Sequence, residues 1–253
     1  MKIVVLAGGL SPERNVSLST GTMVTEALRA LGHRAGLIDL YFGLETGGAD
    51  EAFFDAPVSE AYKKISREAP DLDQVRRGRK GDSPSMFGPG VLELCRMADM
   101  VFLALHGTCG EDGRVQAAFD LMGIPYTGAG YLGSAIAMDK DLTKRMVADV
   151  VSTPGWKTVT YTAADIDRLV ETARLPLVVK PVASGSSIGV SIAYTAEELR
   201  RSLTEGLALG GRTVLEEYIR GREIQVGILE DKALPSIEII PKQGFRSEER
   251  RVG

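Results

Sequence analysis

The chain has 253 residues, of which 44% are hydrophobic and 25% are charged, and its formal net charge is -4. This length suits two or three domains, and the negative charge disfavours a nucleic-acid partner held by general electrostatics. Only two cysteines occur, Cys95 and Cys109, which argues against a disulfide framework or a zinc site and predicts a cytoplasmic protein. The sequence has no run of about 18 apolar residues, so no membrane span is predicted.

The first 40 residues have the pattern of a strand, a loop, a helix and a second strand. Residues 2–6 are an apolar run, a glycine turn follows at Gly8-Gly9, residues 17–31 have helical spacing, and residues 35–40 form the second run. Such a unit begins a parallel α/β layer. Residues 43–90 are polar, glycine-rich and weakly periodic, which predicts a long excursion with one or two surface helices.

A charged glycine-rich run follows the next predicted strand, residues 100–105. It reads His-Gly-Thr-Cys-Gly-Glu-Asp-Gly over residues 106–113 and is followed by Gln116. It holds too many charges for a core element, and glycines after a strand allow a sharp turn and the close approach of a ligand. The alternative is a tight loop before a helix, with Glu111 and Asp112 as favourable first-turn acids. The flanking segments predict helices over 91–98 and 114–122 and an extended piece at 124–127.

The pattern changes in the second half, where short strands alternate with helices. We expect an antiparallel sheet with helices on one face. The predicted helices are 134–150, 163–173 and 196–208, and the predicted strands are 156–161, 177–181, 190–194, 213–217, 222–230 and 234–240.

The loop after the first strand reads Gly8-Gly9-x-Ser11-x-Glu13-Arg14. Its spacing does not fit a dinucleotide fingerprint. Glu13 falls at the mouth of the α/β layer, where such sheets bind ligands. The alternative is a strand-to-helix turn with a charged cap.

A lysine closes the strand at 177–181 and leads into a loop of small residues. Lys180-Pro181 is followed by Gly185-Ser186-Ser187-x-Gly189, whose free backbone N–H groups and hydroxyls could cradle a phosphate. The order of residues excludes a P-loop, and the alternative is a hairpin loop with a solvated lysine.

Two further charged positions are also explained by an ordinary solvent-exposed role that needs no ligand. Lys140 alone is typical of a solvated helix face. Glu216 and Glu217 are adjacent in a predicted strand, so their side chains point to opposite sides and at most one lines a given pocket. The alternative for this pair is a charged strand edge that discourages pairing.

Together these segments resemble the D-alanine–D-alanine ligases of the ATP-grasp superfamily. The resemblance extends from residue 1 to about residue 245. It is carried by GGLSPERNVSLSTG at 8–21, LHGTCGEDGRVQAAFDLMGIPYTGAGYLGSAIAMDK at 105–140, VVKPVASGSSIGV at 178–190 and LEEYIRGREIQVGIL at 215–229. It implies an α/β fold in which a parallel, Rossmann-like N-terminal domain (1–128) precedes an ATP-grasp domain. That domain has a central subdomain (129–217) and an incomplete C-terminal subdomain (218–253).

The implied activity is ATP-dependent ligation of two D-alanine molecules through an acyl phosphate, for cell-wall peptidoglycan, by a homodimer that contacts neither nucleic acid nor membrane. The resemblance assigns the ammonium of the first substrate to Glu13 and places His106 in the same pocket. It assigns the ATP phosphates to Lys140 and Lys180, and the loop over the phosphates and the first substrate to Ser186 and Ser187, of which Ser186 is also expected to be catalytic. It assigns adenine to Glu216 and to the backbone of Glu217 and Ile219, and the ribose hydroxyls to Glu223.

The end of the chain departs from the family pattern. The segments expected to hold Mg²⁺ or Mn²⁺ would lie beyond residue 253, and residues 246–253 read as non-native sequence. We therefore expect this chain to lack the metal and to be inactive. The alternatives are a ligase that joins D-alanine to D-lactate or D-serine, another ATP-grasp carboxylate–amine ligase, or a non-catalytic nucleotide-binding fragment.

Overall fold

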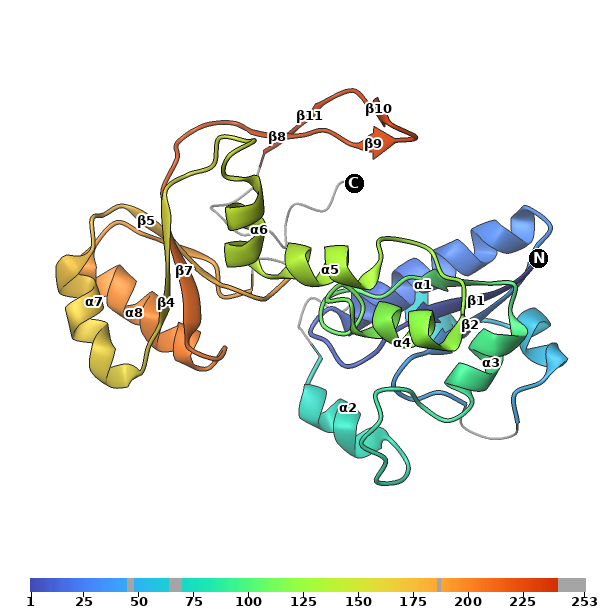
Figure 1. Cartoon of the computed structure of the whole chain (residues 1–253). Helices are drawn as coiled ribbons and strands as arrows, with labels where there is room; N and C mark the ends of the chain where they lie inside the picture. Colours follow the sequence, from blue (N-terminus) through green and yellow to red (C-terminus); the bar gives the residue numbers. More distant parts are fainter. Residues whose placement is uncertain (45–47, 64–69, 186–187, 241–253) are drawn as a thin grey trace. The chain divides into compact units, whose positions relative to one another are not determined.

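A computed structural model describes residues 1–44, 48–63, 70–185 and 188–240 (Figure 1). The chain divides into two compact units, Met1–Met138 and Asp139–Gly253. The predicted domain boundaries at 128/129 and 217/218 remain predictions. No helix within the described ranges is long and apolar enough to cross a membrane.

The first unit contains a three-stranded parallel sheet of order β2-β1-β3. Alternate residues of β1 enter two different cores, so both faces of the sheet are covered. Ile3 and Val5 pack with Leu18 of α1, whereas Val4 and Leu6 pack in the cluster that includes Leu94 of α3 and Phe119 of α4. The elements are β1 Lys2–Ala7, α1 Arg14–Ala30, β2 Arg34–Asp39, α3 Val91–Met97, β3 Met100–Leu103, α4 Arg114–Met122 and α5 Tyr131–Met138. The predicted parallel α/β layer is confirmed.

Helix α1 begins three residues earlier than predicted, because Arg14 is buried. Its guanidinium pairs with Asp39 and donates to the Gly9 carbonyl at 2.8 Å. Arginine is rarely buried in proteins, whereas here only 6% of Arg14 is exposed.

The excursion after β2 is only partly a surface feature. Its 3-10 helix η2 (Glu60–Lys63) and its α-helix α2 (Leu72–Gly78) contain no buried residue, as expected of surface helices. The turn η1 (Glu51–Asp55) instead places Phe54 fully inside the core. The prediction of surface helices holds for η2 and α2. Phe54 packs in the core instead, because an exposed phenylalanine would forgo its burial energy.

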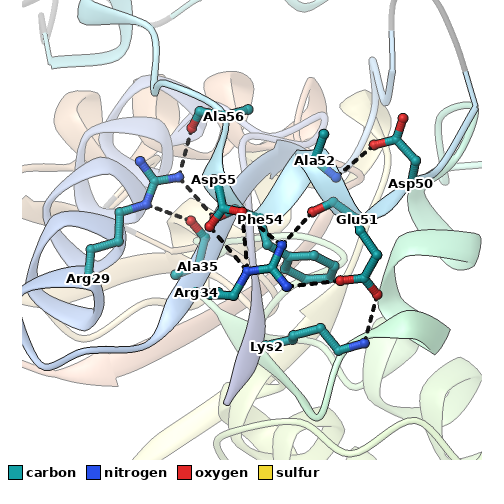
Figure 2. A network of polar contacts seen from close by, with 10 residues as sticks. All are labelled: Lys2, Arg29, Arg34, Ala35, Asp50, Glu51, Ala52, Phe54, Asp55 and Ala56. Carbon is teal, nitrogen blue, oxygen red and sulfur yellow. Dashed lines mark hydrogen bonds and ion pairs between the residues drawn. The ribbon is translucent and has the colours of Figure 1, made fainter.

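A polar network fastens η1 to the sheet (Figure 2). The Arg34 guanidinium contacts Asp55 Oδ2 at 2.7 Å and Glu51 Oε2 at 3.0 Å, and Lys2 Nζ contacts Glu51 Oε1 at 2.9 Å. Arg29 Nη2 donates to the Ala56 carbonyl at 2.7 Å. These ion pairs are exposed and individually weak. We therefore infer that they orient η1 on the sheet, and that burial of Phe54 supplies most of the free energy that holds η1 in place.

The second unit is built on a four-stranded antiparallel sheet of order β4-β7-β5-β6. Leu215 of β7 packs in the core cluster that includes helix residues Leu169 and Leu199. Its neighbour Glu216 points to the opposite face, where it contacts Lys144 of α6. The elements are α6 Lys140–Val147, β4 Trp156–Thr160, η3 Ala163–Asp165, α7 Ile166–Thr172, β5 Leu177–Pro181, β6 Ser191–Ala193, α8 Ala196–Leu207 and β7 Arg212–Glu217. The predicted antiparallel sheet is confirmed. The prediction that helices lie on only one face of it is wrong, since α6 lies on the second face.

The predicted helix over 134–150 is two helices, α5 and α6. Asp139 lies between them with φ -86° and ψ 105°, and its carboxylate accepts a hydrogen bond from Leu142 N at 2.9 Å. Asp139 is therefore the cap of a new helix, which apolar periodicity alone does not reveal.

The last described part of the chain forms two short antiparallel pairs, β8 with β11 and β9 with β10. The predicted strand over 222–230 is interrupted, and the turn falls at Glu230 and Asp231, both with positive φ. The elements are β8 Glu223–Gln225, β9 Ile228–Leu229, β10 Lys232–Ala233 and β11 Ile237–Ile239.

We predict that Phe54→Ala lowers the free energy of unfolding by about 3–5 kcal/mol, because it leaves a cavity in a closed core. Leu121→Ala, at a side chain that is 91% exposed, is the matched control and should change it by less than about 0.5 kcal/mol. Urea unfolding followed by circular dichroism measures both. Equal effects would mean that η1 is not anchored by Phe54.

Candidate functional site

In the first unit, two loops meet at the carboxyl ends of neighbouring parallel strands. Residues 8–13 follow β1 and residues 104–113 follow β3. Ser11 Oγ donates to the His106 carbonyl at 2.8 Å. A Cβ on Gly107 would lie 3.0 Å from Glu13 Oε2, so the Glu13 carboxylate reaches the second loop. The two predicted substrate residues, Glu13 and His106, therefore lie in adjoining loops.

The His106 ring is approached from two sides. Its Nε2 lies 3.3 Å from Thr20 Oγ1, and its Nδ1 lies 4.0 Å from Glu111 Oε1. The other oxygen of Glu111 accepts a hydrogen bond from Gly107 N at 2.9 Å. Glu111 thus faces His106 and is more than a first-turn acid, a role that the sequence analysis missed. With Glu13 nearby, the loops offer a carboxylate for an ammonium group and an imidazole for a carboxylate or phosphate.

A buried ion pair supports the first loop. Asp39, at the end of β2, pairs with Arg14 and accepts hydrogen bonds from Tyr41 N at 2.8 Å and Phe42 N at 3.0 Å. Gly8 has φ +72° and packs directly against this carboxylate, so a side chain there would clash. The glycine turn and the ion pair together fix where the loop carrying Glu13 leaves the sheet.

Both cysteines are buried and free. Cys109 adopts a left-handed φ of 72° in the second loop, and its N–H donates to Asp112 Oδ2 at 2.9 Å. Burial, with the nearby Asp112 charge, raises the pKa of the Cys109 thiol, and burial raises the pKa of Cys95 to about 12. Neither thiol has the lowered pKa of a nucleophilic cysteine.

In the second unit, the face of the sheet beneath α6 carries a buried carboxylate between two lysines. Glu216, only 6% exposed, accepts Lys144 Nζ at 2.5 Å on Oε1 and pairs with Lys180 on Oε2. Burial acts to raise the pKa of Glu216, but the hydrogen bonds and charges of Lys144 and Lys180 outweigh it and lower the pKa. Glu216 is therefore held as the anion.

Lys140 brings a third ammonium group to this region. Its Nζ donates to the Ser184 carbonyl at 2.7 Å, at the start of the small-residue loop. Burial and then repulsion from Lys180 lower the pKa of Lys140. The Lys140 N–H donates to the Val182 carbonyl at 2.9 Å, so Lys140 lies beside the end of the strand that holds Lys180, and an anion bound by both ammonium groups would relieve their repulsion. Ser186 and Ser187, the predicted phosphate-covering residues, lie outside the described residues.

The remaining predicted residues flank Glu216. Glu217 is exposed, and its N–H donates to the Gly155 carbonyl at 2.8 Å. Thus adjacent Glu216 and Glu217 point to opposite sides, as predicted. Ile219 is 57% exposed, and Glu223 is also exposed. The contacts assigned to these residues with adenine and ribose remain predictions.

Helix α6 contributes a second buried acid that sequence reasoning missed. Asp141 Oδ1 accepts hydrogen bonds from Trp156 Nε1 at 2.9 Å and Thr158 Oγ1 at 2.7 Å, and Arg145 contacts its other oxygen at 3.0 Å. The hydrogen bonds from Trp156 and Thr158 lower the pKa of Asp141 to about 2. Asp141 and Lys144 are spaced by one helical turn, a signal that normally indicates a solvated charge pair.

The described residues hold no group of three or more His, Cys, Asp or Glu side chains that could bind a metal ion. The described ranges therefore offer no protein-held site for a divalent cation, and no chemistry is assigned to one.

Two family models match the chain, D-ala D-ala ligase N-terminus over residues 2–129 and D-ala D-ala ligase C-terminus over residues 149–251. The D-alanine–D-alanine ligase of Lacticaseibacillus casei is 40% identical over 248 residues, which cover 97% of this chain and 69% of that protein. The corresponding ligase of Pediococcus pentosaceus is also 40% identical and is covered to 72%. The crystal structure of the Bacillus anthracis ligase complexed with ATP is 29% identical, with a TM-score of 0.65 over 97% of this chain and 68% of that one. The expectation that residues 246–253 are non-native concerns residues that lie outside the described ranges, although the second match extends to residue 251.

We predict that Asp141→Asn lowers stability at pH 7 and flattens its dependence on acid. Because the pKa of Asp141 is lowered in the folded state, its stabilisation is present above about pH 4 and is lost as the pH falls towards 2. Urea unfolding of both proteins between pH 7 and pH 2 measures this. The exposed Asp149→Asn on the same segment is the control, and an unchanged pH profile in Asp141→Asn would contradict the assignment.

Proposed function

Because the chain belongs to the D-alanine–D-alanine ligase family of ATP-dependent ligases, we propose that its site is built to join two D-alanine molecules into D-alanyl-D-alanine with conversion of ATP to ADP and phosphate. The expectation that the 253-residue chain itself is inactive remains a prediction. The observation that carries the proposal is the position of Lys140 beside the end of the strand that holds Lys180. The Lys140 N–H donates to the Val182 carbonyl at 2.9 Å, and its Nζ donates to the Ser184 carbonyl at 2.7 Å. Two ammonium groups that repel each other form a site that an anion stabilises.

In the proposed reaction, a carboxylate oxygen of the first D-alanine attacks the terminal phosphorus of ATP. The bond to ADP breaks, and an acyl phosphate forms. The amine of the second D-alanine then attacks the acyl carbon, phosphate leaves with the electron pair of the C–O bond, and the amine loses a proton. Activation is needed because a free carboxylate resists nucleophiles. Lys140 and Lys180 would neutralise phosphate charge, and Ser186 and Ser187 would cover the phosphates.

In the first unit, Glu13 would bind the ammonium group of the first D-alanine. The adjoining loop contributes His106, which Thr20 and Glu111 approach from two sides. A small zwitterion needs one acidic and one basic or hydrogen-donating partner, and these two loops provide both types.

Further elements of the proposal concern cofactor, assembly and location. Mg²⁺ or Mn²⁺ would accompany the ATP phosphates. The chain would form a homodimer through its first unit and act in the cytoplasm, and its two buried free cysteines are compatible with that compartment.

The reaction is tested by ADP release from the 253-residue chain with ATP, Mg²⁺ and D-alanine. Mass spectrometry measures any D-alanyl-D-alanine that is formed, with L-alanine as the control substrate. ATP binding without D-alanine-dependent ADP release would agree with the expected inactivity of this chain and would favour a non-catalytic nucleotide-binding protein, whereas turnover would contradict that expectation. A mixed product with D-lactate or D-serine would favour the corresponding ligase instead.

We predict that Lys140→Met weakens ATP binding at least about tenfold, because it removes one charged partner of the phosphates. Lys157→Met removes the same charge from an exposed position of β4 and should leave the affinity within about twofold. Isothermal titration calorimetry measures both. Equal affinities in the two variants would remove Lys140 from the phosphate site.

A further inference from the structure

We propose that Lys144 is a positioning residue that fixes the Glu216 carboxylate for the amino group of a nucleotide base, whereas Lys180 is a partner that phosphate can attract away. This inference rests on the proposed function, since it needs a nucleotide at this face of the sheet. It assigns to Lys144 a part in choosing the base.

Lys144 is held by three contacts at once. Its Nζ lies 2.5 Å from Glu216 Oε1 and 2.5 Å from Thr153 Oγ1, and it stands 4.9 Å from the centroid of the Trp156 ring. Its side chain is only 10% exposed. Asp141 accepts the indole N–H of Trp156 at 2.9 Å, so the aromatic ring beside Lys144 is itself fixed. Lys144 therefore has little freedom to leave the carboxylate.

Lys180 holds the other oxygen of Glu216 in a different setting. Its side chain is 24% exposed, against 8% for Glu216. It lies in β5, directly before the loop whose Val182 and Ser184 carbonyls accept hydrogen bonds from the N–H and the Nζ of Lys140, at 2.9 Å and 2.7 Å. A phosphate beside Lys140 and Lys180 would compete with Glu216 for the Lys180 ammonium, because the site would then pair two cations with a multiply charged anion.

The consequence for Glu216 depends on Lys144. A buried carboxylate that lost its only cation would carry a large desolvation penalty. With Lys144 in place, Glu216 keeps one fixed partner on Oε1 and presents Oε2 to a new donor. A carboxylate accepts hydrogen bonds and donates none, so this oxygen suits a base with an exocyclic amino group and opposes one with a carbonyl in that position.

The test compares the binding of ATP with that of inosine triphosphate, which carries a carbonyl where ATP carries the amino group. Isothermal titration calorimetry gives both dissociation constants for the wild-type chain and for Lys144→Met, Lys180→Met and Lys157→Met. We expect Lys144→Met to reduce the preference for ATP about tenfold while inosine triphosphate binds within about twofold of wild type. Lys180→Met should weaken both nucleotides alike, and Lys157→Met should change neither.

A second variant distinguishes positioning from a loss of folding. Glu216→Gln should lose the same preference, and the double variant Lys144→Met/Glu216→Gln should lose no more than either single variant, because both act on one interaction. Circular dichroism checks that each variant is folded, and Glu216→Gln provides the test if Lys144→Met is not.

The outcomes separate the two proposals. A Lys144→Met chain that keeps the wild-type preference, or a double variant whose losses add, would overturn the role of Lys144 alone. A wild-type chain that binds neither nucleotide would overturn the proposed function and this inference with it.

Discussion

A carboxylate that is shut away from water must be matched by positive charge, and this constraint organises the second unit around Glu216. The acid lies on β7, one lysine comes from the neighbouring strand β5, and the other comes from helix α6 across the face of the sheet. Helix α6 is further secured by Asp139, which contacts Arg212 at the start of β7 at 2.8 Å. The charges thus determine which helix covers this face, whereas apolar burial on the opposite face supplies most of the stabilisation.

Much of the fold follows from local patterns in the sequence. Apolar periods and glycine turns predict the parallel layer of the first unit and the antiparallel sheet of the second, because the spacing of apolar residues within each strand and helix indicates its buried face. The exceptions are positions where a residue behaves against its type. Phe54 lies in a polar segment but packs in an apolar core formed by residues distant in sequence. Arg14 is buried at a helix start because it pairs with Asp39, 25 positions away.

The candidate site residues of the two units also differ in how far the sequence alone predicts them. The resemblance places Glu13 and His106 in one pocket, and the structure puts their loops at the ends of neighbouring parallel strands. Lys144 could not be assigned, since its contact with Glu216 spans 72 positions of the chain and depends on how α6 lies on the sheet. Its sequence signal, a lysine one turn after an aspartate, is the same as that of an ordinary solvated pair.

The protonated, enclosed state of Cys95 and Cys109 makes the chain well suited to chemical labelling. Maleimides and iodoacetamides react with exposed thiolates, and neither native sulfur presents one near neutral pH. A single cysteine introduced at the surface of either unit would therefore carry a fluorophore or spin label selectively. The native sequence would need no prior removal of its own thiols.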